Sequence, residues 1–194
     1  MKTSGRQLFA IAGLSLASAC ASSQYMRPAA TLAPQAADMA RVVFLRPSSM
    51  AGGITLTIVD DKGRFIGDST PGSRFAADVT PGEHAFIAWG EGTHSMKARL
   101  ASGKTYYVEV SPHMGAWSAR FHLTAVKRGS ASLGKLPDWL RETEQLEVLG
   151  AEGQRYVDGR RGTIEEVIQK GLARFAEYDE EERRERTLDP EDGQ

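Results

Sequence analysis

The sequence has only one cysteine, Cys20, among its 194 residues. A lone thiol cannot form an internal disulfide, so the folded part of the chain must be stabilised by packing rather than by crosslinks. The chain also has no run of about 20 apolar residues, the length that a transmembrane helix needs. Its formal net charge is only -1, whereas a nucleic-acid-binding domain usually carries a basic face. With 41% hydrophobic and 25% charged residues, the composition is that of an ordinary globular protein.

The one cysteine directly follows a segment with the pattern of a signal peptide. Two basic residues come first, and Leu8–Ala19 is an apolar run of about a dozen residues that ends in small side chains. This arrangement resembles a bacterial lipoprotein signal, in which the chain is cut before a cysteine that carries diacylglycerol. The resemblance implies that residues 1–19 are removed and that lipidated Cys20 begins the mature protein. The alternative is a plain secretory signal cleaved after Ala17–Ala19.

The residues after the cysteine indicate where the protein is expected to go. Residue 21 is Ala, whereas Asp at this position retains lipoproteins of the enterobacterial type on the inner membrane. The resemblance therefore implies the periplasmic side of the outer membrane, with Cys20 as the membrane contact. Residues 20–39 are rich in Ala, Ser, Pro and Gln, which predicts a flexible tether.

Residues 40–127 are predicted to form an all-β domain. Short apolar or alternating segments are separated by turn signals such as "DDKG", in which Gly63 is free to adopt a positive φ. No helical period interrupts them, so the fold class is mainly β, an antiparallel β-sandwich of about seven to eight strands with a C-terminal α-helical extension. The expected strands are Arg41–Pro47, Ile54–Asp60, Arg64–Ser69, Ser73–Val79, His84–Trp89, Thr93–Leu100, Thr105–Val110 and Trp117–Val126.

Three segments of this region carry a family resemblance. The segments "VVFLRP", "GRFIGDSTPGSRFAADVTPGEHAFIAW" and "LASGKTYYVEVSP" occur in this order. Together they resemble the bacterial lipoprotein domain catalogued as domain-of-unknown-function family 2846, and they are distantly similar to the PEGA-type surface sandwich. The resemblance implies an envelope lipoprotein with a small all-β domain and no assigned chemistry, and it supplies no catalytic residue.

The last third of the chain changes character. Residues 128–135 are predicted to be a Gly/Ser linker, residues 136–180 a helical extension and residues 181–194 a disordered charged tail. Thr163 and Glu166 have the spacing of a capping box and predict the start of the main helix. One stripe of this helix is apolar, formed by Ile164, Val167, Ile168, Leu172, Phe175 and Tyr178.

Two of the expected strands, 41–47 and 84–89, are apolar on both faces. A strand of this kind needs a cover on each side. One cover is the facing sheet, and the hypothesis for the other is the apolar stripe of the C-terminal helix. The alternative is that the second face stays open as a binding site for an envelope protein partner. The candidate residues of this face are Phe44, Phe86, Ile87, Trp89, Ile164, Ile168, Leu172 and Phe175.

The sequence contains only weak matches to catalytic and ligand-binding motifs. Ala98–Thr105 nearly matches a nucleotide-binding P-loop, but a strand follows it where the P-loop needs a helix. The four histidines fall on different strand faces and loops, which argues against a metal site. We therefore expect no cofactor, metal, nucleotide or nucleic acid, and a non-enzymatic binding or structural module of the cell envelope. The alternative is an envelope hydrolase in which His84, His94 or His122 meets a Ser, Asp or Glu side chain.

Overall fold

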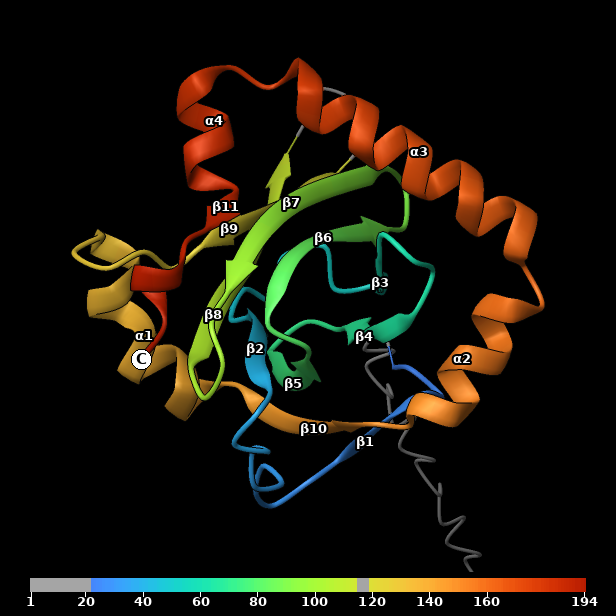
Figure 1. The fold of residues 1–194 in the computed structure, drawn as a ribbon. Helices are drawn as coiled ribbons and strands as arrows, with labels where there is room; N and C mark the ends of the chain where they lie inside the picture. Colours follow the sequence, from blue (N-terminus) through green and yellow to red (C-terminus); the bar gives the residue numbers. More distant parts are fainter. Residues whose placement is uncertain (1–21, 115–118) are drawn as a thin grey trace, which may run out of the picture.

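The computed structural model describes residues 22–114 and 119–194. Two β-sheets pack face to face, and helices lie on their outer sides (Figure 1). The predicted signal peptide, residues 1–19, and the predicted lipidation site Cys20 lie outside the described residues. Residues 40–127 contain all eight strands expected there, so the alternating sequence pattern located them correctly.

The first sheet has six strands in the order β1-β10-β5-β2-β8-β9. Its β2–β5 and β8–β9 pairs are antiparallel, whereas β2 pairs with β8 in parallel and β10 pairs with β5 in parallel. In chain order its strands are β1 (Met26–Pro28), β2 (Ala40–Arg46), β5 (Ser73–Val79), β8 (Thr105–Met114), β9 (Ala119–Ala125) and β10 (Glu144–Val148).

The second sheet has five strands in the order β11-β7-β6-β3-β4. Its pairs are antiparallel except at the edge, where β11 pairs with β7 in parallel. In chain order the strands are β3 (Leu56–Asp60), β4 (Phe65–Ser69), β6 (Gly82–Trp89), β7 (Thr93–Leu100) and β11 (Thr187–Leu188).

The fold is mainly β, as predicted, but a simple antiparallel sandwich of seven to eight strands is wrong. Both sheets are mixed, and the described residues contain 11 strands and four α-helices. Three of the strands, β1, β10 and β11, come from segments predicted to be tether, helical extension and tail. They join the sheets at long sequence separation, which a local pattern does not reveal.

The space between the two sheets is filled by alternate side chains of the strands. Phe44 of β2 stacks on Phe75 of β5 with ring centroids 5.3 Å apart, and it meets the ring of Phe86 edge-on at 5.4 Å. On β7, Met96 and Ala98 face this core. Lys97 and Arg99, between and beyond them, are exposed. The period of two along the strand thus decides what each sheet buries.

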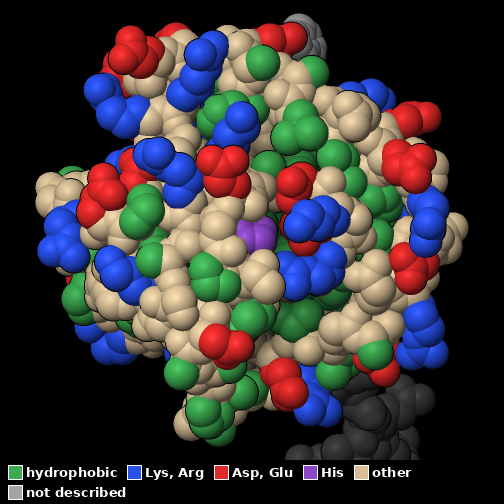
Figure 2. Space-filling view, in the orientation of Figure 1, with side chains coloured by type: hydrophobic (Ala, Val, Ile, Leu, Met, Phe, Trp, Pro, Cys, Tyr) green, Lys and Arg blue, Asp and Glu red, His purple; other side chains and the backbone are tan. Residues whose placement is uncertain are grey.

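Helices cover the outer faces of both sheets. The helices are α1 (Ala131–Glu142), α2 (Gly150–Asp158), α3 (Arg161–Glu177), α4 (Glu180–Glu185) and a 3-10 turn η1 (Pro190–Asp192). Helix α1 places Leu136 on Val43 and Leu45 of β2. Helix α3 runs over β6 and β7 (Figure 1). Outside these contacts, charged side chains of both signs are interspersed over the face seen in Figure 2.

Several boundaries in the N-terminal and middle segments differ from those predicted. Residues 26–28 of the predicted tether form β1, because they find a free edge on β10. Within the predicted linker, the Ser130 side chain accepts a hydrogen bond from the Leu133 N–H and starts α1. Helix α3 begins at Arg161, without the predicted capping box at Thr163.

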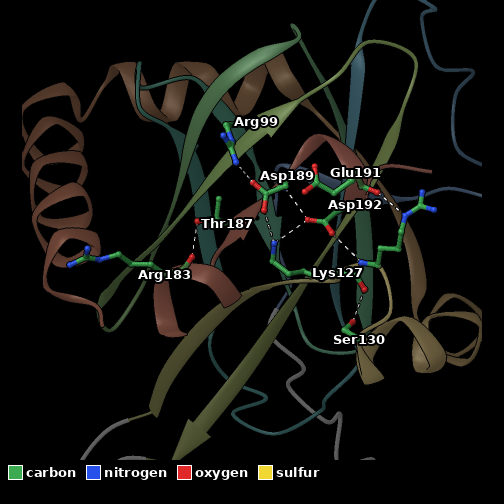
Figure 3. A network of polar contacts seen from close by, with 9 residues as sticks. Arg99, Lys127, Ser130, Arg183, Thr187, Asp189, Glu191 and Asp192 are labelled. Carbon is green, nitrogen blue, oxygen red and sulfur yellow. Dashed lines mark hydrogen bonds and ion pairs between the residues drawn. The ribbon is translucent and has the colours of Figure 1, made fainter. Parts of the chain in front are cut away.

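The charged tail is ordered, in contrast to the prediction. Residues 187–188 form β11, and the side chain of Leu188 is fully buried in the core between the sheets. Asp189 then accepts hydrogen bonds from Arg99 at 2.6 Å and from Lys127 at 2.9 Å, and Lys127 also reaches Asp192 at 3.2 Å (Figure 3). One apolar anchor and a few ion pairs therefore hold a segment that has no amphipathic stripe.

The attachment of α2 depends on a glycine. A Cβ atom at Gly153 would overlap the ring of Phe65 on β4. We expect Gly153→Ala to lower the free energy of unfolding by about 1–3 kcal/mol, because overpacking must push the helix off the sheet. The matched control is Gly162→Ala in α3, where a Cβ atom meets nothing within 4 Å. It should be neutral or stabilising, since alanine favours helix over glycine. Urea unfolding of both variants tests this, and equal midpoints would contradict the role of Gly153.

Candidate functional site

The residues predicted to form one covered or partner-binding face fall into separate groups in the structure. Ile87 of β6 lies in one buried cluster with Ile164 and Ile168 of α3, and Trp89 and Leu172 pack at its margin. Helix α3 therefore covers this face of the second sheet. No open apolar partner face remains there among the described residues of β6.

The remaining predicted residues lie elsewhere. Phe44 and Phe86 point to the opposite side of their strands, into the core between the sheets. The sequence interpretation grouped them with Ile87 because both faces of these strands are apolar. Phe175 lies near the end of α3, where the Lys97 ammonium sits 5.0 Å from its ring centroid and Tyr178 packs edge-on at 5.8 Å. The second face of β2 is covered by α1 rather than by α3.

A hollow lies where the β3–β4 hairpin meets α2 and α3. It has a volume of about 520 Å³, which is within the range of small-molecule sites. We call it the hairpin pocket. Its lining residues are Asp61, Lys62, Gly63, Arg64, Gln154, Val157, Asp158, Arg161, Ile164, Glu165, Ile168 and Gln169.

The hairpin that forms one wall is fixed by a buried carboxylate. Asp60 is 2% exposed, and its Oδ1 accepts the backbone N–H groups of Lys62 at 3.0 Å and Arg64 at 2.8 Å. Its Oδ2 accepts a hydrogen bond from Nε of Arg64 at 3.1 Å. Gly63 completes the turn with a φ of 77°, which glycine adopts without strain. The carboxylate thus holds the loop rigid and sets the stem of Arg64 at the rim of the hairpin pocket.

The opposite wall is tied to the hairpin through one amide side chain. Gln154 of α2 accepts the Phe65 N–H at 2.9 Å through Oε1. Its Nε2 donates to the Gly63 carbonyl at 3.3 Å and to Asp158 Oδ1 at 3.1 Å. The bonds to Phe65 and Gly63 join residues that are 89 and 91 positions apart in the sequence. Hydrogen bonds from the Asp60 and Gln154 side chains to the backbone therefore hold the two walls of the pocket together.

The hairpin pocket has an apolar floor and a charged rim. Val157, Ile164 and Ile168 are buried beneath it. The rim carries three cationic residues, Lys62, Arg64 and Arg161, and three acidic ones, Asp61, Asp158 and Glu165. A lining of this kind suits a ligand that combines an apolar part with charges of both signs, such as an amino acid or a short peptide. The lining residues, all of them described, include no Ser, Thr, Cys, His or Tyr, so the site offers no hydroxyl, thiol or imidazole nucleophile.

The four histidines do not assemble one site. His84 donates from Nε2 to the Thr80 carbonyl at 2.7 Å, and His94 Nε2 accepts the Phe121 N–H at 3.3 Å. His122 stacks on His113 with ring centroids 3.9 Å apart. Within the described ranges, no group of three His, Cys, Asp or Glu residues is arranged to hold a metal ion. The roles of His84 and His94 are contacts with the backbone.

One serine–histidine contact occurs, and the sequence interpretation did not single it out. Ser111 Oγ lies 3.2 Å from His113 Nε2, and both side chains belong to β8. A nucleophile–base pair normally has a third group that orients the base. In the part of the chain that the structure describes, no carboxylate hydrogen-bonds to His113. The contact therefore lacks the third member of a catalytic arrangement.

Burial of His94 makes the stability of the protein depend on pH. The side chain is 6% exposed, and desolvation, with nearby Arg174, Arg186 and Arg120, lowers its pKa to about 4 from an ordinary value of 6.5. In the unfolded chain it takes up a proton as the pH falls through 6.5, whereas in the folded state it does so only near 4. Stability is therefore fully present above pH 6.5 and decreases between about 6.5 and 4, by up to about 3 kcal/mol.

We expect His94→Gln to flatten this dependence. The measurement is urea unfolding at pH 7.5, 6 and 4.5. Burial also lowers the pKa of His122 to about 4, so His94→Gln/His122→Gln should show the flattest curve. A variant that loses as much stability on acidification as the wild type would show that His94 is not the responsible group.

No protein-family model matches the chain, and no curated protein matches it. None of the helices in residues 22–114 and 119–194 is long and apolar enough to cross a membrane. The family resemblance therefore rests on the quoted sequence segments alone.

Proposed function

We propose that this protein is a cell-envelope lipoprotein of the outer membrane, anchored at Cys20 on the periplasmic side. It acts as a non-enzymatic module that binds a zwitterionic ligand, an amino acid or a short peptide, in the hairpin pocket. The peptide is either free or a segment of an envelope protein. The resemblance to the lipoprotein family supports the anchoring, and the N-terminal segment before Cys20 supports export.

The observation that carries the binding role is the construction of the hairpin pocket. Its floor is apolar, and its two walls are held together by the hydrogen bonds of Asp60 and Gln154. A rigid site loses little conformational freedom when a ligand enters. Charges of both signs at the rim set the ligand's direction, because its carboxylate faces Arg64 or Arg161 and its ammonium faces Asp158 or Glu165.

The alternative of an envelope hydrolase has weaker support. It was predicted on His84, His94 or His122, and among the described residues none of the three hydrogen-bonds to a Ser, Asp or Glu side chain. The serine–histidine contact that the structure contains joins Ser111 and His113, which are two positions apart on one strand. His84 and His94 are hydrogen-bonded to backbone groups, so neither is placed as the base of a serine nucleophile. The binding module is therefore the function that the geometry supports best.

A filled-pocket variant tests the binding role. Gln169 lines the hairpin pocket from α3 and is exposed, so Gln169→Trp should occupy the space without disturbing the core. Glu166→Trp is the matched control, because Glu166 is exposed on the same helix and does not line the pocket. Saturation-transfer NMR with a panel of free amino acids and dipeptides should give signals with the wild type and Glu166→Trp that are lost in Gln169→Trp. Equal signals in all three proteins, or none with the wild type, would reject this site.

A further inference from the structure

The folded part of the chain starts very close to the predicted anchor. Ser23 Oγ donates to Asp68 Oδ2 at 2.5 Å, and the side chain of Asp68 on β4 is almost completely buried. Two residues later, the Tyr25 carbonyl accepts the Leu149 N–H at 2.8 Å, and β1 then pairs with β10. The segment predicted to be a flexible tether is therefore fixed to the domain from Ser23 onward.

The distance from the anchor to the domain follows from the covalent chain. Cys20 and Ser23 are three residues apart, and an extended chain spans at most about 3.6 Å per residue, so their Cα atoms are no more than about 11 Å apart. If Cys20 carries lipid at the bilayer surface, Ser23 must stay within that distance of it. A domain held so closely cannot turn a remote face toward the membrane.

The surface around this attachment point has side chains suited to lipid headgroups. Tyr25 packs on Tyr156 of α2 with ring centroids 4.9 Å apart, and the guanidinium of Arg160 lies 4.1 Å from the Tyr156 ring centroid. Arg155 precedes Tyr156 on α2 and Arg27 follows Tyr25 by two residues on β1, and their side chains are 76% and 60% exposed. Tyrosine is favoured at the level of lipid headgroups, and arginine is attracted to anionic ones.

Acidic residues are also present on this surface. Arg27 pairs with Glu147 at 2.8 Å, and Arg155 lies 3.4 Å from Glu152. The positive and negative charges on this surface are therefore too nearly balanced for electrostatic attraction alone to bring the domain to the membrane. The short covalent connection provides the orientation, and the exposed arginines and the tyrosine pair provide a surface compatible with headgroups.

We infer that the end of the molecule formed by β1 and α2 is its membrane-facing surface, in contact with the phospholipid headgroups of the bilayer that holds Cys20. Strand β1 and helix α2 lie together at one side of the fold, and α4 lies on the other (Figure 1). Because Gln154 and Val157 of α2 line the hairpin pocket, this orientation places the pocket near the membrane. The inference rests on the proposed lipid anchor.

Single introduced cysteines test the orientation. In the lipidated protein the Cys20 thiol is consumed, so a new cysteine is the one reactive thiol. We compare Arg155→Cys on α2 with Arg184→Cys on α4, both exposed helical arginines. Each lipidated full-length variant is placed in vesicles of phosphatidylethanolamine and phosphatidylglycerol, and its labelling by a bulky polar maleimide is compared with labelling in detergent. We expect vesicles to slow labelling at position 155 several-fold and to leave position 184 unchanged.

The outcomes separate the two proposals. Failure of the wild type to stay with the vesicles rejects the anchor itself. Anchored protein in which both positions label equally in vesicles and in detergent overturns the membrane-facing surface and leaves the anchor standing. A long Gly/Ser insertion between Ser22 and Ser23 should restore fast labelling at position 155 while the protein remains vesicle-bound. Continued slow labelling after the insertion would show that the short connection is not what orients the domain.

Discussion

Replacing Arg46 by Met is expected to lower the free energy of unfolding by about 4 kcal/mol, near the upper end of single-residue effects. Arg46 ends β2 and is fully buried. Its four hydrogen bonds all go to carbonyl oxygens, from Nη1 to Ile54 at 2.7 Å and Ser69 at 3.4 Å, and from Nη2 to Ala51 at 2.9 Å and Met50 at 3.2 Å.

The size of the effect follows from what the substitution leaves behind. The guanidinium also lies 4.8 Å from the ring centroid of Phe121, and its burial lowers the pKa to about 10. Methionine fills much of the space but donates no hydrogen bond. The carbonyls of Met50 and Ile54 in the β2–β3 connection then lose the guanidinium, whereas the Ala51 carbonyl keeps the Ile54 N–H at 3.0 Å. Each buried group left unsatisfied costs about 1–3 kcal/mol.

Urea unfolding followed by tryptophan fluorescence measures this effect. The matched control is Arg141→Met, because Arg141 lies on α1 with a side chain 67% exposed. It should change stability by less than about 0.5 kcal/mol. Arg46→Lys should fall between the two, since lysine keeps the charge but lacks the planar fork of donors. An Arg46→Met midpoint equal to that of Arg141→Met would contradict the structural role of the buried arginine.

Replacing Leu188 by Ala is expected to cost about 3 kcal/mol, as is typical for a fully buried leucine. The residue is fully buried although it lies six positions before Gln194. Its strand β11 is held to β7 by the register Leu188↔Ala98 and by the bond from the Lys97 N–H to the Arg186 carbonyl at 2.9 Å. If the tail were disordered, Leu188→Ala would leave the free energy of unfolding unchanged.

The control uses a leucine that is not buried. Leu32 is 38% exposed, so Leu32→Ala should alter the unfolding midpoint little. A chain ending at Arg186 should be less stable still than Leu188→Ala. It also loses the pair of backbone bonds between Thr105 and Gln194, at 2.9 and 3.0 Å. Equal stability of the truncated and complete chains would restore the interpretation of residues 187–194 as a disordered end.

The sequence by itself determined the strands of residues 40–127 and the faces that they bury. On β7, the alternation of Met96 and Ala98 with Lys97 and Arg99 predicted which side meets the other sheet, and the structure agrees. The turn at Gly63 was also predictable, because the requirement for a positive φ is local. These features depend on neighbours one to four residues away, which is the range that a sequence pattern contains.

Only the tertiary structure decided which segments pair and where a site forms. Strand β10 was predicted to be part of a helical extension, yet it pairs with β5, which offers free backbone groups at the sheet edge, and β1 then pairs with the other side of β10. Leu188 is one apolar residue in a charged segment and becomes an anchor only through the cavity it fills between the sheets. The hairpin pocket requires Gly63 and Gln154 to meet. Contacts at such separation are fixed by the packing of the whole chain and leave no periodic trace in the sequence.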